Sequence, residues 1–225
     1  MAERMREAMN LIELTAAGEA QSVAGTVRVT ASVFASHYIL PPILSKLRAN
    51  EPAIQIELVA SDETESLLFR DADIAVRMYE PTQHDLVARH IGDTNIGVFA
   101  ATAYLDRRGR PKVASELFDH DLVGYDRTPL ILDTMAKMGH RVDREAFATR
   151  CDNQAANWAL VCAGCGIGFA QLAVGRSNSL VEELDLGLVI PSLPVWLVAH
   201  PSMRQTPRLK QVWAALADGL KDVII

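Results

Sequence analysis

The chain has 225 residues, 49% hydrophobic and 22% charged, which suits a soluble globular protein with one large core or two small ones. Its 22 lysines and arginines against 28 aspartates and glutamates give a net charge of −6, which argues against a basic nucleic-acid-binding surface. The sequence has no apolar run of roughly 20 residues, no signal-peptide pattern and an odd number of cysteines, so we expect a cytoplasmic protein with reduced thiols and no membrane contact.

The first half of the chain predicts alternating helices and strands. Residues 3–17 carry an apolar stripe at steps of three and four, which is typical of a helix. Ser32 or Ser36 is the expected cap of the next helix, and Pro52 ends it. The β-α-β-α-β order predicts a parallel, doubly wound sheet. The strands are "TVRVTAS", Ile54–Ala60 and Ala72–Arg77, and the helices that separate them are "HYILPPILSKLRANEP" and "DETESLLFRD".

A second series of elements follows residue 101 and predicts a second α/β lobe. No long linker separates the two series, so we expect two lobes with a cleft between them, a favoured place for small ligands. The expected strands are "HDLVGYD", "FATRCD", "IGFAQ" and Leu193–Pro201, and the expected helices are "LILDTMAKMG", "NQAANWALVCAG" and the closing "PRLKQVWAALADGLKDVI".

The stretch "VCAGCGIGFAQ" places Cys162 and Cys165 three residues apart. A reactive dithiol favours a helix N-terminus, but Cys162 falls in the last turn of a helix capped by Asp152 or Asn153. A phosphate-binding loop runs strand, glycine, helix, which is the reverse of the order here. A metal knuckle needs four ligands, and Cys151 would supply only a third. We therefore interpret the stretch as a helix C-cap followed by a buried strand.

Other patterns that carry chemistry are equally sparse. The histidines show no HExxH spacing, and neither a GxSxG turn nor a P-loop is present. The isolated cluster Asp119–Asp121 and the run "DRRGRPK" are interpreted as structural or solvated surface. The sequence therefore predicts no catalytic residue, no metal site and no cofactor.

Four stretches together resemble the effector-binding domain of LysR-type transcriptional regulators. They are "GTVRVTASVFASHYILPPILSKLRANEPAIQIELVASD", "DADIAVRMYEPTQHDLVARHIGD" with its Asp-x-Ala-x-Arg strand, "AYLDRRGRPKVASELFDHDLVGY" and "WALVCAGCGIGFAQ". The resemblance covers residues 3–222 and implies an α/β type 2 periplasmic-binding-protein fold with two Rossmann-like subdomains. The implied boundaries are 26–99 plus 200–225 for subdomain I and 100–199 for subdomain II, with crossings near Phe99-Ala100 and Val198-Ala199.

The family carries an N-terminal winged helix-turn-helix and a linker helix. The resemblance implies that residues 1–24 are a remnant of that linker, that the chain is a fragment with Met1 introduced, and that DNA is contacted only through the absent domain. It also implies a homodimer or tetramer in which the helix around Leu40–Leu47 packs against the helix around Ala156–Cys162 of another copy.

The resemblance further implies a non-enzymatic sensor with a small-molecule effector, such as a carboxylate or an aromatic metabolite, in the cleft. The free N–H groups after "SVFAS" and the guanidinium of Arg127 suit an anion, while Phe34 and Phe169 suit apolar contact. Ser36 serves equally well as a helix cap, Asp62 is better explained as the cap of the next helix because it would repel an anion, and Phe169 serves equally as core. The effector contacts implied are Ser32, Phe34, Ser36, Ser61, Asp62, Tyr125, Arg127, Asn153, Phe169 and Gln171.

Three alternatives remain at this point. A transport receptor of the same fold would need a leader or lipid anchor, and none is visible. An enzyme on this fold, such as a prephenate dehydratase, would need a catalytic motif, and none matches. A pure dimerisation module with a closed cleft is compatible with the sequence.

Overall fold

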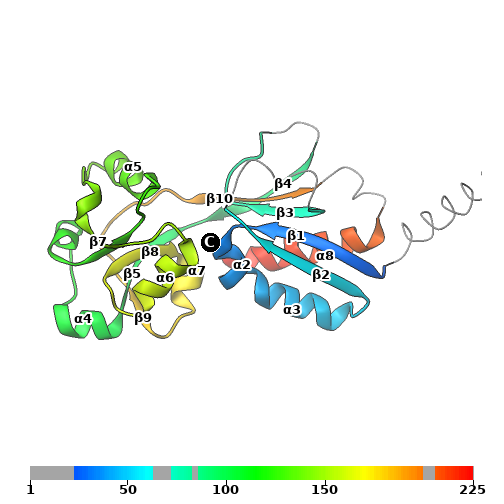
Figure 1. Ribbon diagram of the computed structural model, residues 1–225, viewed down its shortest axis with the longest axis horizontal. Helices are drawn as coiled ribbons and strands as arrows, with labels where there is room; N and C mark the ends of the chain where they lie inside the picture. The colour runs from blue at the N-terminus through cyan, green and yellow to red at the C-terminus, as the bar shows by residue number, and fades with distance from the viewer. Residues whose placement is uncertain (1–22, 63–71, 83–85, 200–205, 225) are drawn as a thin grey trace, which may run out of the picture.

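The computed structural model describes residues 23–62, 72–82, 86–199 and 206–224, which form two α/β lobes side by side (Figure 1). Each lobe is built on a five-stranded sheet flanked by helices. The helix expected over residues 3–17, and nearly all of the one expected over 62–71, lie outside the described residues. The two-lobe organisation predicted from the repeated α/β series is confirmed.

The first sheet has the strand order β2-β1-β3-β10-β4 and is mixed. β1 pairs in parallel with β2 and β3, as predicted, but β10 runs antiparallel to both β3 and β4. The parallel pairing predicted for the first three strands is therefore confirmed, and β10 enters this sheet from the second lobe and runs against its neighbours. The strands are β1 (Gly25–Ala31), β2 (Ile54–Ala60), β3 (Ile74–Arg77), β4 (Val87–Thr94) and β10 (Leu193–Ala199).

The helices of the first lobe begin and end where local chemistry dictates. Ser32 caps α2, since its Oγ accepts the N–H of Ala35 at 3.2 Å. Two prolines occupy the first turn of α3, where their missing N–H groups are tolerated, so a new helix starts after Ile39. The closing helix buries one apolar face in α8 and η4, formed by Leu209, Val212, Leu216 and Leu220. The helices are α2 (Val33–Tyr38), α3 (Leu40–Asn50), α8 (Pro207–Gly219) and the 3₁₀ turn η4 (Leu220–Val223).

The second sheet has the strand order β7-β6-β8-β5-β9. β6 is parallel to β7 and β8, whereas β5 is antiparallel to β8 and β9. Its strands are β5 (Ile96–Ala101), β6 (Leu122–Gly124), β7 (Phe147–Arg150), β8 (Ile167–Gln171) and β9 (Val181–Glu183). Its helices are α4 (Thr102–Arg108), α5 (Leu130–Lys137), α6 (Gln154–Cys162) and α7 (Leu172–Arg176), with 3₁₀ turns η1 (Ala114–Asp119) and η2 (Arg144–Ala146).

Two segments connect the lobes, at Asn95 between β4 and β5, and immediately before β10. The crossings expected near Phe99-Ala100 and Val198-Ala199 fall inside β5 and β10, where the paired strands already belong to one sheet. Both crossings therefore lie earlier in the chain than the resemblance implied. Both junctions carry residues typical of a strand end, Asp93 to Asn95 at the first and Pro191 and Ser192 at the second, so the sequence does mark them.

The glycine-rich stretch is a helix C-cap followed by a buried strand, as predicted. Gly164 takes a φ of +84°, and the N–H of Cys165 returns to the carbonyl of Leu160 at 3.0 Å. Gly168 lies on β8 directly under α6, where a methyl group would approach Cγ2 of Val161 to 2.4 Å. The glycines therefore let the helix turn back and lie close to its own following strand.

The apolar core of the first lobe continues into the second through α2 and α6. Phe34 and Trp158 belong to one cluster of buried side chains, and Trp158 meets Phe99 edge-on at 5.7 Å between ring centroids. The hydroxyl of Tyr38 donates to the carbonyl of Ala155 at 3.4 Å. Figure 1 shows α2 at the boundary between the lobes, so this contact fixes one side of the junction.

Candidate functional site

A cavity of about 180 Å³ lies at the junction and is lined by both lobes. Phe34 of α2 and Leu193 of β10 line it from the first lobe, and β8, α5 and α6 form most of the opposite wall. Apolar side chains dominate the wall. The lining residues are Phe34, Ile96, Tyr125, Leu130, Ile131, Thr134, Met135, Met138, Gln154, Asn157, Phe169, Ala170, Gln171, Ile190, Pro191 and Leu193.

Three of the polar side chains in this wall differ in whether their hydrogen-bonding groups have partners within the protein. Thr134 donates its hydroxyl to the carbonyl of Leu130 at 2.7 Å. The amide of Asn157 donates to the carbonyl of Gly124 at 2.7 Å, which ties α6 to the end of β6. Gln171 is only 5% exposed, and its Oε1 is buried without a hydrogen-bond partner in the described part of the chain. This acceptor is therefore buried within the wall and is not exposed to the cavity.

Tyr125 follows β6 and lines the cavity. Burial raises the pKa of its phenol to about 12, and the carboxylates of Asp62 and Asp152 add to the shift. Asp62 belongs to the first lobe and Tyr125 to the second, so this electrostatic contact crosses the junction. The phenol is therefore neutral at physiological pH and sits in a negative local potential.

Asp152 holds the loop that carries Tyr125. Its Oδ1 accepts the backbone N–H groups of Asp126 and Arg127 at 3.0 Å and of Thr128 at 3.2 Å. These backbone bonds are the main reason that the pKa of this carboxyl lies well below its ordinary range. The loop is therefore ordered around a stable carboxylate.

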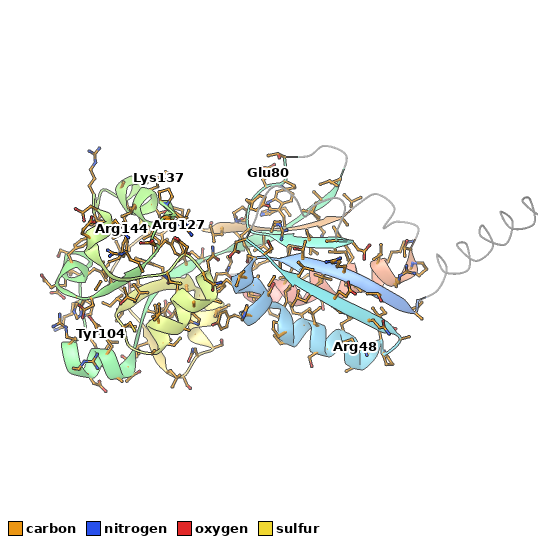
Figure 2. The ribbon with its side chains drawn as sticks, in the orientation of Figure 1. Arg48, Glu80, Tyr104, Arg127, Lys137 and Arg144 are labelled. Carbon is orange, nitrogen blue, oxygen red and sulfur yellow. The ribbon has the colours of Figure 1, made fainter. Side chains whose placement is uncertain are left out.

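Arg127 does not line the cavity. Its Nε donates to Oδ2 of Asp152 at 3.2 Å, and its side chain is 88% exposed. Figure 2 shows Arg127 near Arg144, which pairs with the carboxylate of Asp126 on the same loop. Both guanidinium groups therefore face carboxylates of the chain itself.

The start of α2, where an anion was expected, is occupied by the chain's own groups. Asp62 Oδ1 accepts the N–H of Val33 at 3.0 Å, and Ser32 takes that of Ala35. Ser36 is buried and donates its hydroxyl to the carbonyl of Ala31 at 3.5 Å, so it is not the cap of α2. A carboxylate at this position opposes a second anion.

Four of the ten predicted contact residues come together in the cavity wall: Phe34, Tyr125, Phe169 and Gln171. Asn153 caps α6 by accepting the N–H of Ala156 at 2.9 Å. Ser61 donates its N–H to the carbonyl of Ala31 at 2.9 Å, beside the junction. A role of the other six in ligand contact stays a prediction, and they are Ser32, Ser36, Ser61, Asp62, Arg127 and Asn153.

The α5 side of the cavity was not predicted from the sequence. The helix itself was expected, but the spacing of Leu130, Ile131 and Thr134 was not connected with the cleft. Asn157 was also missed, although a polar residue on an otherwise apolar helix face is a signal that could have found it.

The surroundings of Cys162 disfavour a thiolate. Burial raises the pKa of the Cys162 thiol, and the amide of Asn178 donates to its Sγ at 3.2 Å. Within the described ranges, no three His, Cys, Asp or Glu side chains gather as metal ligands would. No helix in the same ranges is long and apolar enough to cross a membrane.

Two α/β lobes that share a cavity at their junction define a ligand-binding domain of the two-lobe periplasmic-binding-protein type. A family model described as the LysR substrate binding domain matches residues 20–221, so the chain belongs to this family. Residues 20–221 therefore correspond to the effector-binding domain found in LysR-type transcriptional regulators. This identification favours the regulator over the transport receptor and the enzyme.

Curated relatives carry the names of regulators. The chain is 30% identical over 202 residues to the HTH-type transcriptional regulator CrgA of Neisseria meningitidis serogroup C (strain 8013). That match covers 85% of the chain and 65% of the relative. The HTH-type transcriptional activator AaeR of Escherichia coli (strain K12) is 25% identical over 105 residues, covering 47% of the chain and 34% of the relative. The chain thus spans less than two thirds of these relatives.

Solved structures share the fold. The regulatory domain of CrgA from Neisseria meningitidis superposes with a TM-score of 0.74 at 22% identity, covering 89% of this chain and 99% of that one. The full-length Vibrio cholerae virulence activator AphB gives a TM-score of 0.70 at 15% identity, covering 96% and 76%. The two-lobe fold predicted from the sequence is therefore confirmed.

Proposed function

We propose that the chain senses a small molecule bound in the cavity between its lobes. The observation that carries the proposal is that Phe34 and Leu193 of the first lobe line the same cavity as Phe169 and Gln171 of the second. A ligand there would contact both lobes, so it would favour one relative arrangement of the two. In a parent protein with a DNA-binding domain, that arrangement would control the binding of DNA.

We also propose that the protein self-associates and that it is cytoplasmic. It would bind its ligand without converting it to a product. A homodimer would pack α3 against α6 of another copy, and small exposed residues on α6, Ala156 and Ala159, would permit close approach. A tetramer is the alternative assembly. Ala159→Glu should convert a dimer to a monomer in sedimentation velocity, whereas Ala163→Glu beyond the end of α6 should not. A wild-type monomer at all concentrations would contradict the dimer.

Thermal unfolding against a panel of aromatic alcohols, aromatic carboxylates and amino acids tests the sensor. A ligand that binds only the folded state stabilises it by ~2.7 kcal/mol at a hundredfold excess over Kd. Thr134→Trp fills the cavity from α5, whereas Lys137→Trp places the same ring on the exposed side of that helix (Figure 2). We expect a hit to be lost in the first variant, kept in the second and recovered without conversion to product. A response unchanged in Thr134→Trp would place binding outside the cavity.

A further inference from the structure

The cavity between the lobes has aromatic walls without a cationic side chain, and this inference rests on the proposed function. Among the lining residues that the structure describes, none is charged. Phe34 lines the cavity from the first lobe, and Tyr125 and Phe169 line it from the second. Leu130 lines it too and is 49% exposed, so one side is open to solvent. A ligand can therefore rest an apolar body on the wall and keep a charged group near the opening.

Two carboxylates flank this wall, one from each lobe. Asp62 accepts the N–H of the residue before Phe34 at 3.0 Å. Asp152 accepts the N–H groups of the two residues after Tyr125, also at 3.0 Å. Burial is the main reason that the pKa of the Tyr125 phenol rises to about 12, and both carboxylates raise it further, whereas no cation among the described groups lowers it. The local potential beside Tyr125 is therefore negative.

The positive ends of the nearby helices do not reverse this potential. A helix N-terminus carries about half of an elementary charge, and α2 is only six residues long. The carboxylate of Asp62 lies at that end with a full negative charge. In the same way α6 begins at Gln154, two residues after Asp152. The carboxylates outweigh the helix ends, so an anion is opposed and a cation is attracted.

The arginines near the cavity are engaged by carboxylates of their own lobe. Nε of Arg127 donates to Asp152 at 3.2 Å, and the side chain is 88% exposed. Arg144 pairs with the carboxylate of Asp126. Asp62 stands on the other lobe and is contacted by a neutral N–H group. These guanidinium groups are therefore not directed at a ligand, whereas the charge of Asp62 is available to one.

Aromatic faces and carboxylates together suit a cation. An ammonium group over an aromatic face gains a cation–π attraction, and the two carboxylates add Coulombic attraction. We propose that the cavity binds an organic cation, with its apolar body against Phe34 and Phe169 and its ammonium group near Tyr125. Because Asp62 and Asp152 belong to different lobes, such a cation reduces the repulsion between them and favours approach of the lobes. A carboxylate of equal size would meet the opposite sign at the same place.

Three probes that share a phenylethyl body separate charge from shape. At pH 7, phenethylamine is a cation, phenethyl alcohol is uncharged and hydrocinnamate is an anion. Titration of the full ¹⁵N-labelled chain, followed by amide chemical shifts, gives a Kd for each probe into the millimolar range. We expect the amine to bind about 3–10-fold more tightly than the alcohol, as a cation–π contact and a partly exposed ion pair imply, and hydrocinnamate to bind most weakly.

Salt provides a control on the role of charge. Screening weakens attraction between partly exposed charges, so the ranking should flatten between about 0.02 M and about 0.5 M salt, while the Kd of phenethyl alcohol changes little. A ranking that does not respond to salt would mean that the head groups are distinguished by shape, and it would overturn the inference.

Two matched variants assign the attraction to one carboxylate. Asp62→Asn removes the charge but keeps an Oδ1 that accepts the N–H of Val33, so phenethylamine should bind about 3-fold more weakly while phenethyl alcohol keeps its wild-type Kd. Asp185→Asn makes the same change at an exposed carboxylate whose Oδ1 accepts the N–H of Gly187 at 3.3 Å, and it should keep the wild-type ranking. If Asp62→Asn does not fold, the ranking on the wild type and its response to salt decide the matter.

Failure of this inference and failure of the proposed function give different results. Tightest binding by hydrocinnamate, with shifts in Tyr125 and Phe169, would overturn the preference for a cation while leaving a ligand cavity in place. An amine preference that survives undiminished in Asp62→Asn would overturn the role of that carboxylate. Shifts from none of the probes would overturn the inferred ligand class, and the panel with Thr134→Trp would then judge the sensor separately.

Discussion

Gly168→Ala is expected to destabilise the domain by a steric effect that a second substitution removes. The added methyl group would lie 2.4 Å from Cγ2 of Val161, far inside van der Waals contact. Val161 is fully buried between α6 and the sheet, so it cannot swing into solvent. Overpacking of this kind costs about 1–3 kcal/mol. For a chain of this size, about 2 kcal/mol lowers the Tm by about 4–8 °C.

Val161→Ala alone removes two buried methyl groups and should cost about 2 kcal/mol through lost transfer energy and the space left behind. In the double variant, the methyl group of residue 168 would enter that space. We therefore expect a total loss of about 2 kcal/mol instead of the sum of about 4 kcal/mol, a coupling of about 2 kcal/mol. Urea unfolding of the four proteins, with equal m values, measures the coupling.

Strict additivity of the two substitutions would refute the reasoning. It would mean that α6 does not approach β8 at this glycine, and that the close packing described above is wrong. A stabilised Gly168→Ala would refute it more directly, because only the reduced entropy of the unfolded chain would then be acting, worth about 0.4–1 kcal/mol.

Three further predictions concern groups around the cavity. Asn157→Leu removes the amide that holds Gly124 and should cost about 1–3 kcal/mol in urea unfolding, with a loss below about 0.5 kcal/mol speaking against the bond. The pKa of Asp152 is lowered by folding, so its stabilisation is present above about pH 4 and fades as the pH falls through the folded-state value. Asp152→Asn should therefore melt lower at pH 7 and converge with wild type in acid, and parallel curves would contradict this. The raised pKa of Tyr125 contributes stability below pH 10 that is lost as the pH rises through about 12, so absorbance titration of Tyr125→Phe should lack one late-titrating phenol of the wild type, while the raised pKa of Tyr38 is kept.

The sequence predicts most elements of this fold because their signals are local. Strand β2 was expected with the bounds it has, and α6 with its glycine cap followed from capping and periodicity alone. The direction of β10 was not predictable in the same way, since it depends on where the chain returns from the second lobe.

Of the four cavity-lining residues that were predicted, Phe34, Tyr125 and Gln171 lie at or next to strand ends, and Phe169 lies within β8. The placement of Arg127 was not predictable, because its orientation is set by Asp152, 25 positions further along the chain. Asp62 likewise turned out to cap α2 from a distant loop. Polar side chains at the site are directed by long-range partners that no local pattern reveals.

The chain order of the two lobes has a consequence for synthesis on the ribosome. The second lobe is one continuous stretch that begins at β5 and ends before β10, so it is complete while the C-terminal part is still being made. The first lobe begins earlier but lacks β10, an interior strand of its sheet, and α8 until the last residues emerge. Domains fold as units during translation, usually starting from the N-terminus. Here the lobe that starts second is expected to fold first. Strands β1 to β4 are expected to stay exposed, or bound by chaperones, until β10 and α8 have been synthesised.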